Sequence, residues 1–295
     1  LKGRIKDLSN IAKKYDMMKS HSDKLQKFLK DYDPDNWVME KQETEKRGSV
    51  KIIYRAIDIS GYAEEYLFRL GQKIILMSAT ILNADAFASS LGIKKGDYDS
   101  ISLPSPFPKE NRPIITAPIG FMTSKDIDKT LPNMLSMVKE IIKNHPNEKG
   151  IIHTHNTKIA EFLKRSIRSK RLLIAYGENR DKVLDKHIKS KEPTILISPS
   201  MAEGVNLKGE LSKFQIICKI PFPYLGDKVV GKKIKKWKWW YDLQTTRTVI
   251  QSVGRSIRSE NDEAVTYILD KDWERVFNKN KCYLPKNFIE SYIEM

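Results

Sequence analysis

Apolar and polar positions follow two alternating spacings beyond about residue 111. Stretches with apolar residues three or four apart predict amphipathic helices, and short apolar runs bounded by turn residues predict buried strands. The predicted helices cover 131–144, 157–168, 180–189 and 243–259, and the predicted strands cover 150–155, 172–176, 194–198, 214–220 and 264–269. Strands that alternate with helices form parallel sheets covered by helices. We therefore expect an α/β fold for this part of the chain.

The first residues predict a different organisation. Residues 1–48 are rich in Lys, Asp and Glu and carry helical spacing at Leu25, Phe28 and Leu29. This pattern is typical of a helical appendage on the surface.

Between the appendage and the α/β region, the pattern predicts a strand over 51–59, a helix ending at Gly71, and a buried strand with a polar turn over 73–80. Prolines then crowd residues 103–118, which predicts an extended linker and a domain boundary. We expect three parts, with bounds 1–48, 49–110 and 111–295.

The charge balance favours a polyanionic partner. Among 295 residues, 53 Lys and Arg oppose 37 Asp and Glu, which gives a formal net charge of +16. Basic surfaces gain affinity for nucleic acid by releasing condensed counterions, and an anionic membrane surface attracts them in a similar way. A solvated basic surface without such a partner is the plain alternative.

The cysteines and the apolar runs indicate the compartment. Cys218 and Cys282 fit neither zinc-ligand spacing nor a disulfide framework, which favours a reducing compartment. No uninterrupted run of ~18 apolar residues exists, and the first residues do not resemble a signal peptide. We expect a cytoplasmic protein without a membrane partner, associated with the nucleoid in a prokaryote. Because the chain begins with Leu1, we also expect a fragment.

The most specific segment is QSVGRSIRS, residues 251–259. If it is helical, Gln251, Arg255 and Arg258 project from one face, and Gly254 permits close approach of a ligand. Two arginines and a glutamine directed at one target suit a transferring phosphoryl group, because the planar guanidinium groups spread over its negative charge. A solvated basic face of an amphipathic helix is the alternative.

This segment is similar to motif VI of superfamily 2 helicases, Gln-x-x-Gly-Arg-x-x-Arg, and other segments resemble motifs of the XPD/DinG branch in the same order. They are Ser78-Ala79-Thr80 (motif III), Ser105-Pro106-Phe107, residues 150–156 (motif IV), Met201 to Gly209 (motif V) and Ile220-Pro221-Phe222-Pro223. Their common order over roughly residues 50–275 carries the resemblance. Asn206 departs from it, since the family usually has Asp there, and Asn261-Asp262-Glu263-Ala264 replaces the more usual Asp-x-Gly.

The resemblance implies a domain arrangement and a set of site residues. Residues 111–295 would form the second RecA-like lobe, 49–110 the trailing part of the first lobe, and 1–48 the end of its helical Arch insertion. The implied catalytic residues are Gln251, Arg255 and Arg258, with Glu203, Gly204, Asn206 and Gly254 at the nucleotide and Ser78, Ala79 and Thr80 as the coupling segment. Thr154, His155, Asn156 and Ser200 would contact nucleic acid.

The resemblance also implies what the complete motor needs. It would use ATP and Mg²⁺, track 5′ to 3′ on single-stranded DNA, and require an N-terminal half that carries the phosphate-binding loop, on the same gene or a separate chain. The cysteines that hold an iron–sulfur cluster in many relatives belong to a part of the motor absent from this chain. We therefore expect no iron–sulfur cluster here and no ATP hydrolysis by this chain alone.

Two segments imitate nucleotide-binding motifs. Gly226 to Lys233 has phosphate-loop spacing, but Lys233 stands where Ser or Thr must bind Mg²⁺, and a proline-bearing segment precedes it. Asp262-Glu263-Ala264-Val265 resembles a DEAH box, yet it precedes its strand, whereas a Mg²⁺-binding acid belongs at a strand's C-terminal end. We assign neither role.

A run of lysines and aromatic residues at 232–243 suits a single strand, because rings stack on bases and ammonium groups neutralise phosphates. Lys235, Lys238 and Trp239 are the predicted contacts. The helical spacing of Ile234, Trp237, Trp240 and Tyr241 favours core packing for these four. Two rival functions remain: a non-catalytic single-stranded nucleic-acid-binding module that regulates a partner, and an unrelated nucleotide-using α/β enzyme.

Overall fold

A seven-stranded parallel sheet forms the centre of the computed structural model, which describes residues 2–43, 48–200, 207 and 209–293. The strand order is β5-β6-β4-β7-β8-β3-β9, and all pairings are parallel. Every residue of β4, β6 and β7 is buried, as expected for strands covered on both faces. The prediction of an α/β fold with a parallel sheet is confirmed. The strands are β3 (Ile114–Gly120), β4 (Gly150–His153), β5 (Leu172–Ile174), β6 (Ile195–Ser198), β7 (Phe214–Ile217), β8 (Val265–Asp270) and β9 (Tyr292–Ile293).

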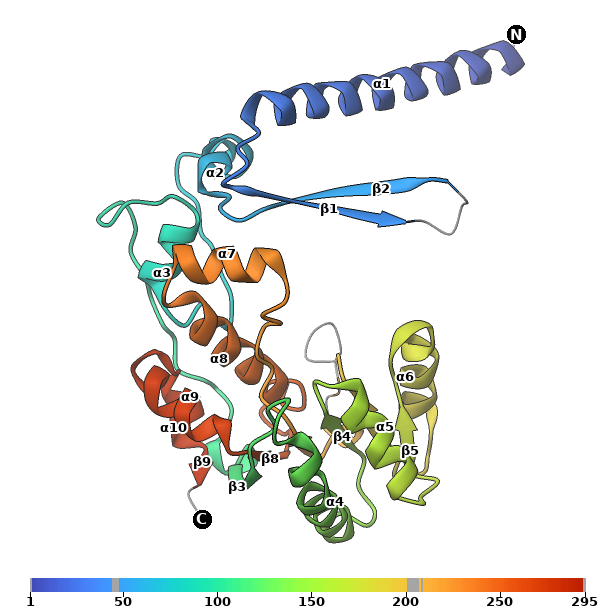
Figure 1. The fold of residues 1–295 in the computed structure, drawn as a ribbon, viewed down its shortest axis with the longest axis vertical. Coiled ribbons are helices and arrows are strands. Elements are labelled where there is room, and N and C mark those ends of the chain that lie inside the picture. The colour runs from blue at the N-terminus through green and yellow to red at the C-terminus, as the bar shows by residue number, and fades with distance from the viewer. Residues whose placement is uncertain (1, 44–47, 201–206, 208, 294–295) are drawn as a thin grey trace.

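Helices lie on both faces of this sheet (Figure 1). Successive strand residues pack on opposite helix layers. Ile216 of β7 packs in the layer of α4 and α5, whereas Ile217 packs in the layer of α8, α9 and α10. This alternation is the period of two that a strand imposes on its side chains. The helices are α4 (Ile127–Asn144), α5 (Thr157–Ser166), α6 (Arg180–Lys189), α8 (Trp240–Val253), α9 (Asp272–Asn280) and α10 (Lys286–Glu290), with 3₁₀ turns at Lys109–Asn111, Gly177–Asn179, Gly209–Leu211 and Lys281–Tyr283.

The N-terminal part consists of a long helix, α1 (Lys2–Asp31), and an antiparallel hairpin of β1 (Trp37–Glu43) and β2 (Val50–Ala56). Figure 1 shows α1 and the hairpin side by side at one end of the molecule. The prediction of helix is right for residues 2–31 and wrong for 37–43. Those residues form a strand because β2 supplies a complete set of backbone partners, and Phe28 packs its ring 5.1 Å from Trp37 and 4.6 Å from Tyr54.

A chain segment without regular strands connects the hairpin to the sheet. It contains α2 (Ser60–Tyr66), a 3₁₀ turn (Phe68–Leu70) and α3 (Ala84–Ser90). The buried strand predicted over 73–80 is absent, and Ile75 and Met77 are 85% and 88% exposed. A strand needs a neighbour for its backbone groups, and no other described segment pairs with these residues. The predicted linker over 103–118 is also partly wrong, because its last residues, from Ile114, belong to the strand β3.

The hairpin lies next to α7 (Lys228–Lys236) in Figure 1. It docks there through a small core of Val38, Ile57, Val229 and Trp237. Arg55 pairs with Asp227 at 2.9 Å and with Glu40 at 2.5 Å, and Lys236 pairs with Asp58 at 2.5 Å. Lys232 donates hydrogen bonds to backbone oxygens of the residues just before β1. This contact places the chain segment between β2 and β3 against α7 and α8, the helices that follow β7.

Candidate functional site

The candidate site lies at the edge of the sheet where β4, β6 and β7 end. Carboxyl ends of parallel strands meet at one edge, and ligands of open α/β sheets bind there. Thr154 and Ser200 follow β4 and β6, and the Thr154 amide donates to the Ser198 carbonyl at 2.9 Å. Ser200 is exposed, whereas the Thr154 side chain is fully buried and its hydroxyl donates to the Asn156 carbonyl. The Asn156 side chain in turn accepts from the Ile159 amide and so caps α5.

Two stacked histidines stand at this edge. The rings of His153 and His155 are 5.9 Å apart and nearly parallel, and His155 has a left-handed backbone with φ of 47°. Burial lowers the pKa of His153 to about 3, with the nearby His155 and Arg255 adding to the effect, and burial also lowers the pKa of His155 to about 4. Both rings are therefore neutral at physiological pH. Within the ranges that the structure describes, no group of three or more His, Cys, Asp or Glu is arranged to hold a metal ion.

Helix α8 ends at Val253, so the predicted helix over 243–259 is too long. Gly254 follows the helix and donates to the Ile250 carbonyl at 2.9 Å, and the Gln215 side chain donates to the Val253 carbonyl at 2.7 Å. Gly favours a helix end because its backbone loses much freedom inside a helix. Arg255 and Arg258 therefore lie in the turn after the helix, and the predicted single face shared with Gln251 is wrong.

The last turns of α8 contact the Ser78-Ala79-Thr80 segment instead. Gln251 donates from Nε2 to Thr80 Oγ1 at 3.3 Å, and Arg247 donates from Nε to the Thr80 carbonyl at 3.2 Å. Ser78 Oγ accepts from the Thr80 amide at 3.2 Å and shapes the turn. Arg247 is not among the predicted site residues, although it precedes Gln251 by one helical turn and so shares its face.

The two predicted arginines differ in environment. Arg255 is half-buried and close enough to His153 to disfavour its protonation. Arg258 is exposed, and among the described residues no carboxylate lies within ion-pair distance of its guanidinium. Glu203, Gly204 and Asn206 lie outside the described residues.

The segment that imitates a phosphate loop has a structural role. The Asp227 carboxylate accepts from the Val229 and Val230 amides, at 2.7 and 3.4 Å, and caps α7. Backbone amides at a helix start are the donors that a phosphate would need. Because Asp227 occupies them and pairs with Arg55, this helix start does not offer a phosphate site.

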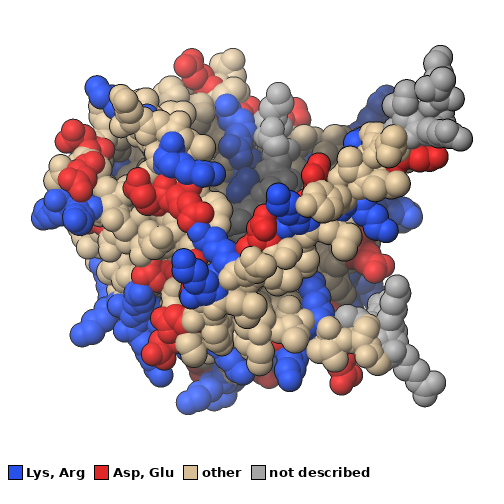
Figure 2. All heavy atoms as spheres, turned by 90° about the horizontal axis from the view of Figure 1, so that it is seen from above, with Lys and Arg blue, Asp and Glu red and all other residues tan. Residues whose placement is uncertain are grey.

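The lysine and tryptophan run straddles the junction of α7 and α8. Lys235 and Lys238 are exposed, and Trp239 is partly buried with its ring 6.0 Å from that of Trp237. Trp237 packs against the hairpin core, in agreement with its predicted packing role. On the face seen from above, Lys and Arg side chains are scattered, with Asp and Glu side chains between them (Figure 2).

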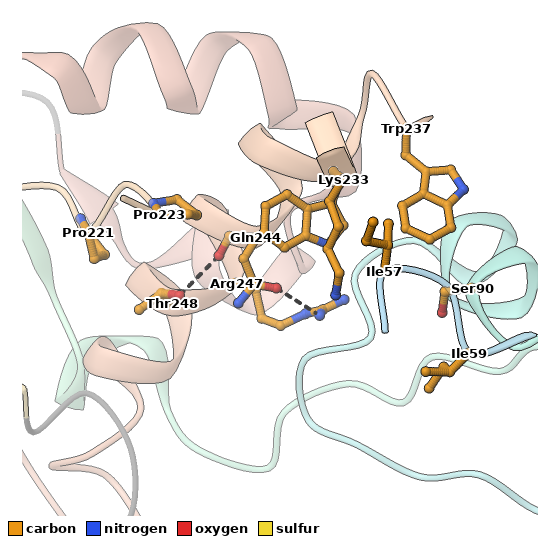
Figure 3. A pocket seen from close by; sticks show the side chains of 11 residues that line it. Ile57, Ile59, Ser90, Pro221, Pro223, Lys233, Trp237, Gln244, Arg247 and Thr248 are labelled. Carbon is orange, nitrogen blue, oxygen red and sulfur yellow. Dashed lines mark hydrogen bonds between the residues drawn. The ribbon is translucent and has the colours of Figure 1, made fainter. Parts of the chain in front are cut away.

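A cavity of about 570 Å³ adjoins this run and is lined by residues of α7, α8 and the segment after the hairpin (Figure 3). Lys233 and Arg247 line it, and burial lowers the pKa of both groups. Lys233 Nζ lies 5.4 Å from the Trp240 ring centre, and in the described chain neither cation has a carboxylate within ion-pair distance. The other lining residues are Ile57, Ile59, Ser90, Pro221, Pro223, Trp237, Trp240, Gln244 and Thr248. The cavity therefore offers positive charge beside flat apolar walls.

Comparisons with known proteins place this architecture among helicases. Residues 133–290 match the family described as the helicase C-terminal domain, which is more than half of the chain. An apo XPD structure superposes with a TM-score of 0.58 at 18% identity, covering 83% of this chain and 53% of that chain. The Xpd4 structure from S. tokodaii gives a TM-score of 0.56 at 14% identity, covering 83% and 48%. The fold is thus that of a RecA-like helicase lobe. The chain belongs to the helicase C-terminal domain family and is of the XPD/DinG type.

Two curated relatives illustrate the match in sequence. The probable ATP-dependent helicase MJ0942 of Methanocaldococcus jannaschii is 28% identical over 252 residues, which cover 75% of this chain and 38% of the relative. The ATP-dependent DNA helicase DinG of Escherichia coli is 27% identical over 260 residues, which cover 80% and 36%. The chain thus spans little more than a third of the length of these relatives. No helix among residues 2–43, 48–200 and 209–293 is both long and apolar enough to cross a membrane.

Proposed function

We propose that this chain is the C-terminal motor half of an ATP-dependent DNA helicase that moves 5′ to 3′ on single-stranded DNA. Its ATP site is completed by an N-terminal half, on the same gene or on a separate chain. The observation that carries the proposal is the contact of Gln251 and Arg247 with Thr80. It joins the end of α8, which leads into Arg255 and Arg258, to the segment that resembles the coupling motif. A change at the nucleotide can therefore reach both segments.

In this proposal Arg255 and Arg258 supply positive charge to ATP from across the cleft, and Gln251 couples that charge to Thr80. The Arg258 guanidinium suits the role because no described carboxylate neutralises it. Gly254 ends the helix and lets the arginines turn toward the cleft, and Glu203, Gly204 and Asn206 belong to the nucleotide side by resemblance. Positive charge placed before the reaction stabilises charge that develops in the transition state.

Mg²⁺ is assigned to the other half of the motor. Among the described residues no group of three or more His, Cys, Asp or Glu is gathered, and the Asp262 carboxylate, in the segment that resembles a DEAH box, accepts from backbone amides. When bound, Mg²⁺ would neutralise phosphate charge in the complete motor. This chain then contributes arginine charge and the coupling contact.

Unwinding by the complete motor tests the proposal. We expect ATP-dependent separation of a duplex that carries a 5′ single-stranded tail and no separation of the same duplex with a 3′ tail. Unwinding from the 3′ tail alone would contradict the direction. Strand binding without any unwinding or ATP turnover would support the rival function, a non-catalytic binding module.

The strand contacts of this chain are proposed at Lys235, Lys238 and Trp239, together with His155, Asn156 and Ser200. The predicted contact of Thr154 is not retained, because its side chain is fully buried and its hydroxyl donates to the Asn156 carbonyl. The two exposed lysines and Trp239 stand beside the cavity in which Lys233 and Arg247 present unpaired positive charge. Cations track phosphates and rings stack on bases, so this neighbourhood suits one strand rather than a duplex.

Binding of a single-stranded oligonucleotide to the chain checks these contacts. Because log K for single strands falls with log salt by ~0.7 for each neutralised phosphate, Lys235→Ala with Lys238→Ala should reduce the slope by about 1.4. Trp239→Ala should cost about 1–3 kcal/mol of binding free energy. Fluorescence anisotropy between about 50 and 200 mM salt measures both. The matched control removes two exposed lysines of α4, Lys139 and Lys143, and equal slopes in the two double variants would contradict the assignment.

A further inference from the structure

Asp262 is a buried carboxylate that lies between the arginine turn and β8. It is 7% exposed, and its Oδ2 accepts from the backbone amides of Arg258 and Ser259, both at 2.7 Å. Burial alone would raise the pKa of Asp262, but these donors and the Gly209 amide hold it below its usual range. The carboxylate is therefore charged at neutral pH and fixes the backbone at Arg258.

The same carboxylate joins two segments that are distant in sequence. Gly209 ends the segment that resembles motif V, and its backbone has a left-handed φ of 61° beside Asp262. A second bond lies close by, because Ser256 Oγ donates to Ser212 Oγ at 2.7 Å in a buried position. The turn with Arg255 and Arg258 is thus tied to Gly209, the last residue of the motif V segment, and to Ser212, three residues after it.

The choice of partners matters for the arginine. A carboxylate bound to a guanidinium neutralises it, but Asp262 binds the backbone of Arg258 and leaves its exposed side chain without a described acidic partner. Charge that must meet a transferring phosphoryl group is most effective when it is held in place beforehand. Asp262 thus fixes the backbone of Arg258 without neutralising its guanidinium group.

We propose that Asp262 is a positioning residue that fixes Arg258 for catalysis and ties its turn to the motif V segment. This inference rests on the proposed role of Arg258. It predicts that loss of the Asp262 carboxylate acts through Arg258 and not through general loss of structure.

A double-mutant cycle in the complete motor tests the inference. We expect Asp262→Ala to lower kcat for ATP by about 10- to 10²-fold, the effect of a misplacement of about 1 Å, with KM and strand affinity within about threefold. The double variant of Asp262→Ala and Arg258→Ala should be about as slow as Arg258→Ala alone, because both changes remove the same contribution to catalysis. Asp262→Asn, which keeps the shape, should lie between wild type and Asp262→Ala.

Asp270 provides the matched control. It is also buried, at 2% exposure, and its carboxylate accepts from the Ile220 and Asp272 amides, but it contacts neither arginine. The reductions in kcat caused by Asp270→Asn and by Arg258→Ala should multiply in the double variant, whereas those caused by Asp262→Ala and Arg258→Ala should not. The unfolding midpoint of each variant, followed by circular dichroism, measures the structural cost.

The outcomes separate the inference from the proposed function. If Arg258→Ala slows turnover while Asp262→Ala and Asp262→Asn leave kcat unchanged, the positioning role is overturned. It is also overturned if the reductions in kcat caused by Asp262→Ala and Arg258→Ala multiply in the double variant. A lower unfolding midpoint of Asp262→Asn without a change in kcat overturns it as well. If Arg258→Ala itself leaves turnover intact, the proposed role of the arginine fails.

Discussion

Arg258→Ala in the complete motor should lower ATP turnover by at least ~10²-fold while single-strand affinity stays within about threefold. The Arg258 side chain is exposed, has no described acidic partner, and sits on a backbone fixed by Asp262. An arginine directed at the transferring phosphoryl group acts when charge spreads over its oxygens, so it lowers the barrier more than it tightens ATP binding. Steady-state kcat and KM, with strand affinity by anisotropy, measure the difference.

Arg258→Lys should be nearly as slow as Arg258→Ala, because an ammonium group lacks the planar fork that spans two oxygens. Arg168→Ala is the matched control, since this exposed arginine follows α5 at the opposite edge of the sheet from the candidate site. Intact turnover in both Arg258 variants, with weakened strand binding, would show that the turn faces DNA or solvent. Arg255 is half-buried beside His153. We expect Arg255→Ala to weaken nucleotide affinity more than Arg258→Ala does.

The α/β core follows from the sequence because its strands and helices carry unambiguous periods. α6 occupies 180–189 as predicted, and the predicted strand segments contain β4, β6 and β7. These strands are buried on both faces, so most of their positions are apolar and form short continuous runs. The N-terminal hairpin was only half predicted, because Trp37–Glu43 mixes charged and apolar residues and becomes a strand through its pairing with β2.

The candidate site was less accessible to sequence reasoning because contacts between distant segments shape it. The apolar spacing of α8 continues past Val253, but Gly254, the Gln215 side chain and the Asp262 carboxylate end the helix and turn the chain. Nothing local reveals that Asp262 will meet Gly209, and its likeness to a DEAH box points away from that role. Arg247 could have been found from its helical spacing to Gln251, although its contact with Thr80 could not.

The likeness of Gly226 to Lys233 to a phosphate loop illustrates why spacing needs context. The loop requires free amides at a helix start and a hydroxyl for Mg²⁺. Here Asp227 takes the amides of Val229 and Val230, and Lys232 donates to backbone oxygens near the hairpin. Two residues of this segment, Asp227 and Lys232, thus hold the hairpin on α7.

The chain alone should hydrolyse ATP at least ~10³-fold more slowly than the motor formed with its N-terminal half. Phosphoryl transfer depends on a phosphate cradle and metal-assisted charge stabilisation, and arginines from the opposite lobe act only on a nucleotide already held. The segment with phosphate-loop spacing offers no free amides, since Asp227 accepts from those at the start of α7, and among the described residues no group of three or more His, Cys, Asp or Glu is gathered. DNA-stimulated phosphate release by the chain, by the added half and by their mixture measures the effect.

A turnover of ~1 s⁻¹ or more by the chain alone, in the range of working phosphoryl-transfer enzymes, would contradict this expectation. Lys232→Ala then locates the cause. If it abolished that turnover, Gly226 to Lys233 would be a functional phosphate loop despite its capped helix. If the chain is inactive, Lys232→Ala should instead weaken only the docking of the hairpin on α7, because its ammonium group binds the Pro34 and Asp35 carbonyls. Restored turnover on adding the N-terminal half to both the wild type and Lys232→Ala would place the phosphate site in that half.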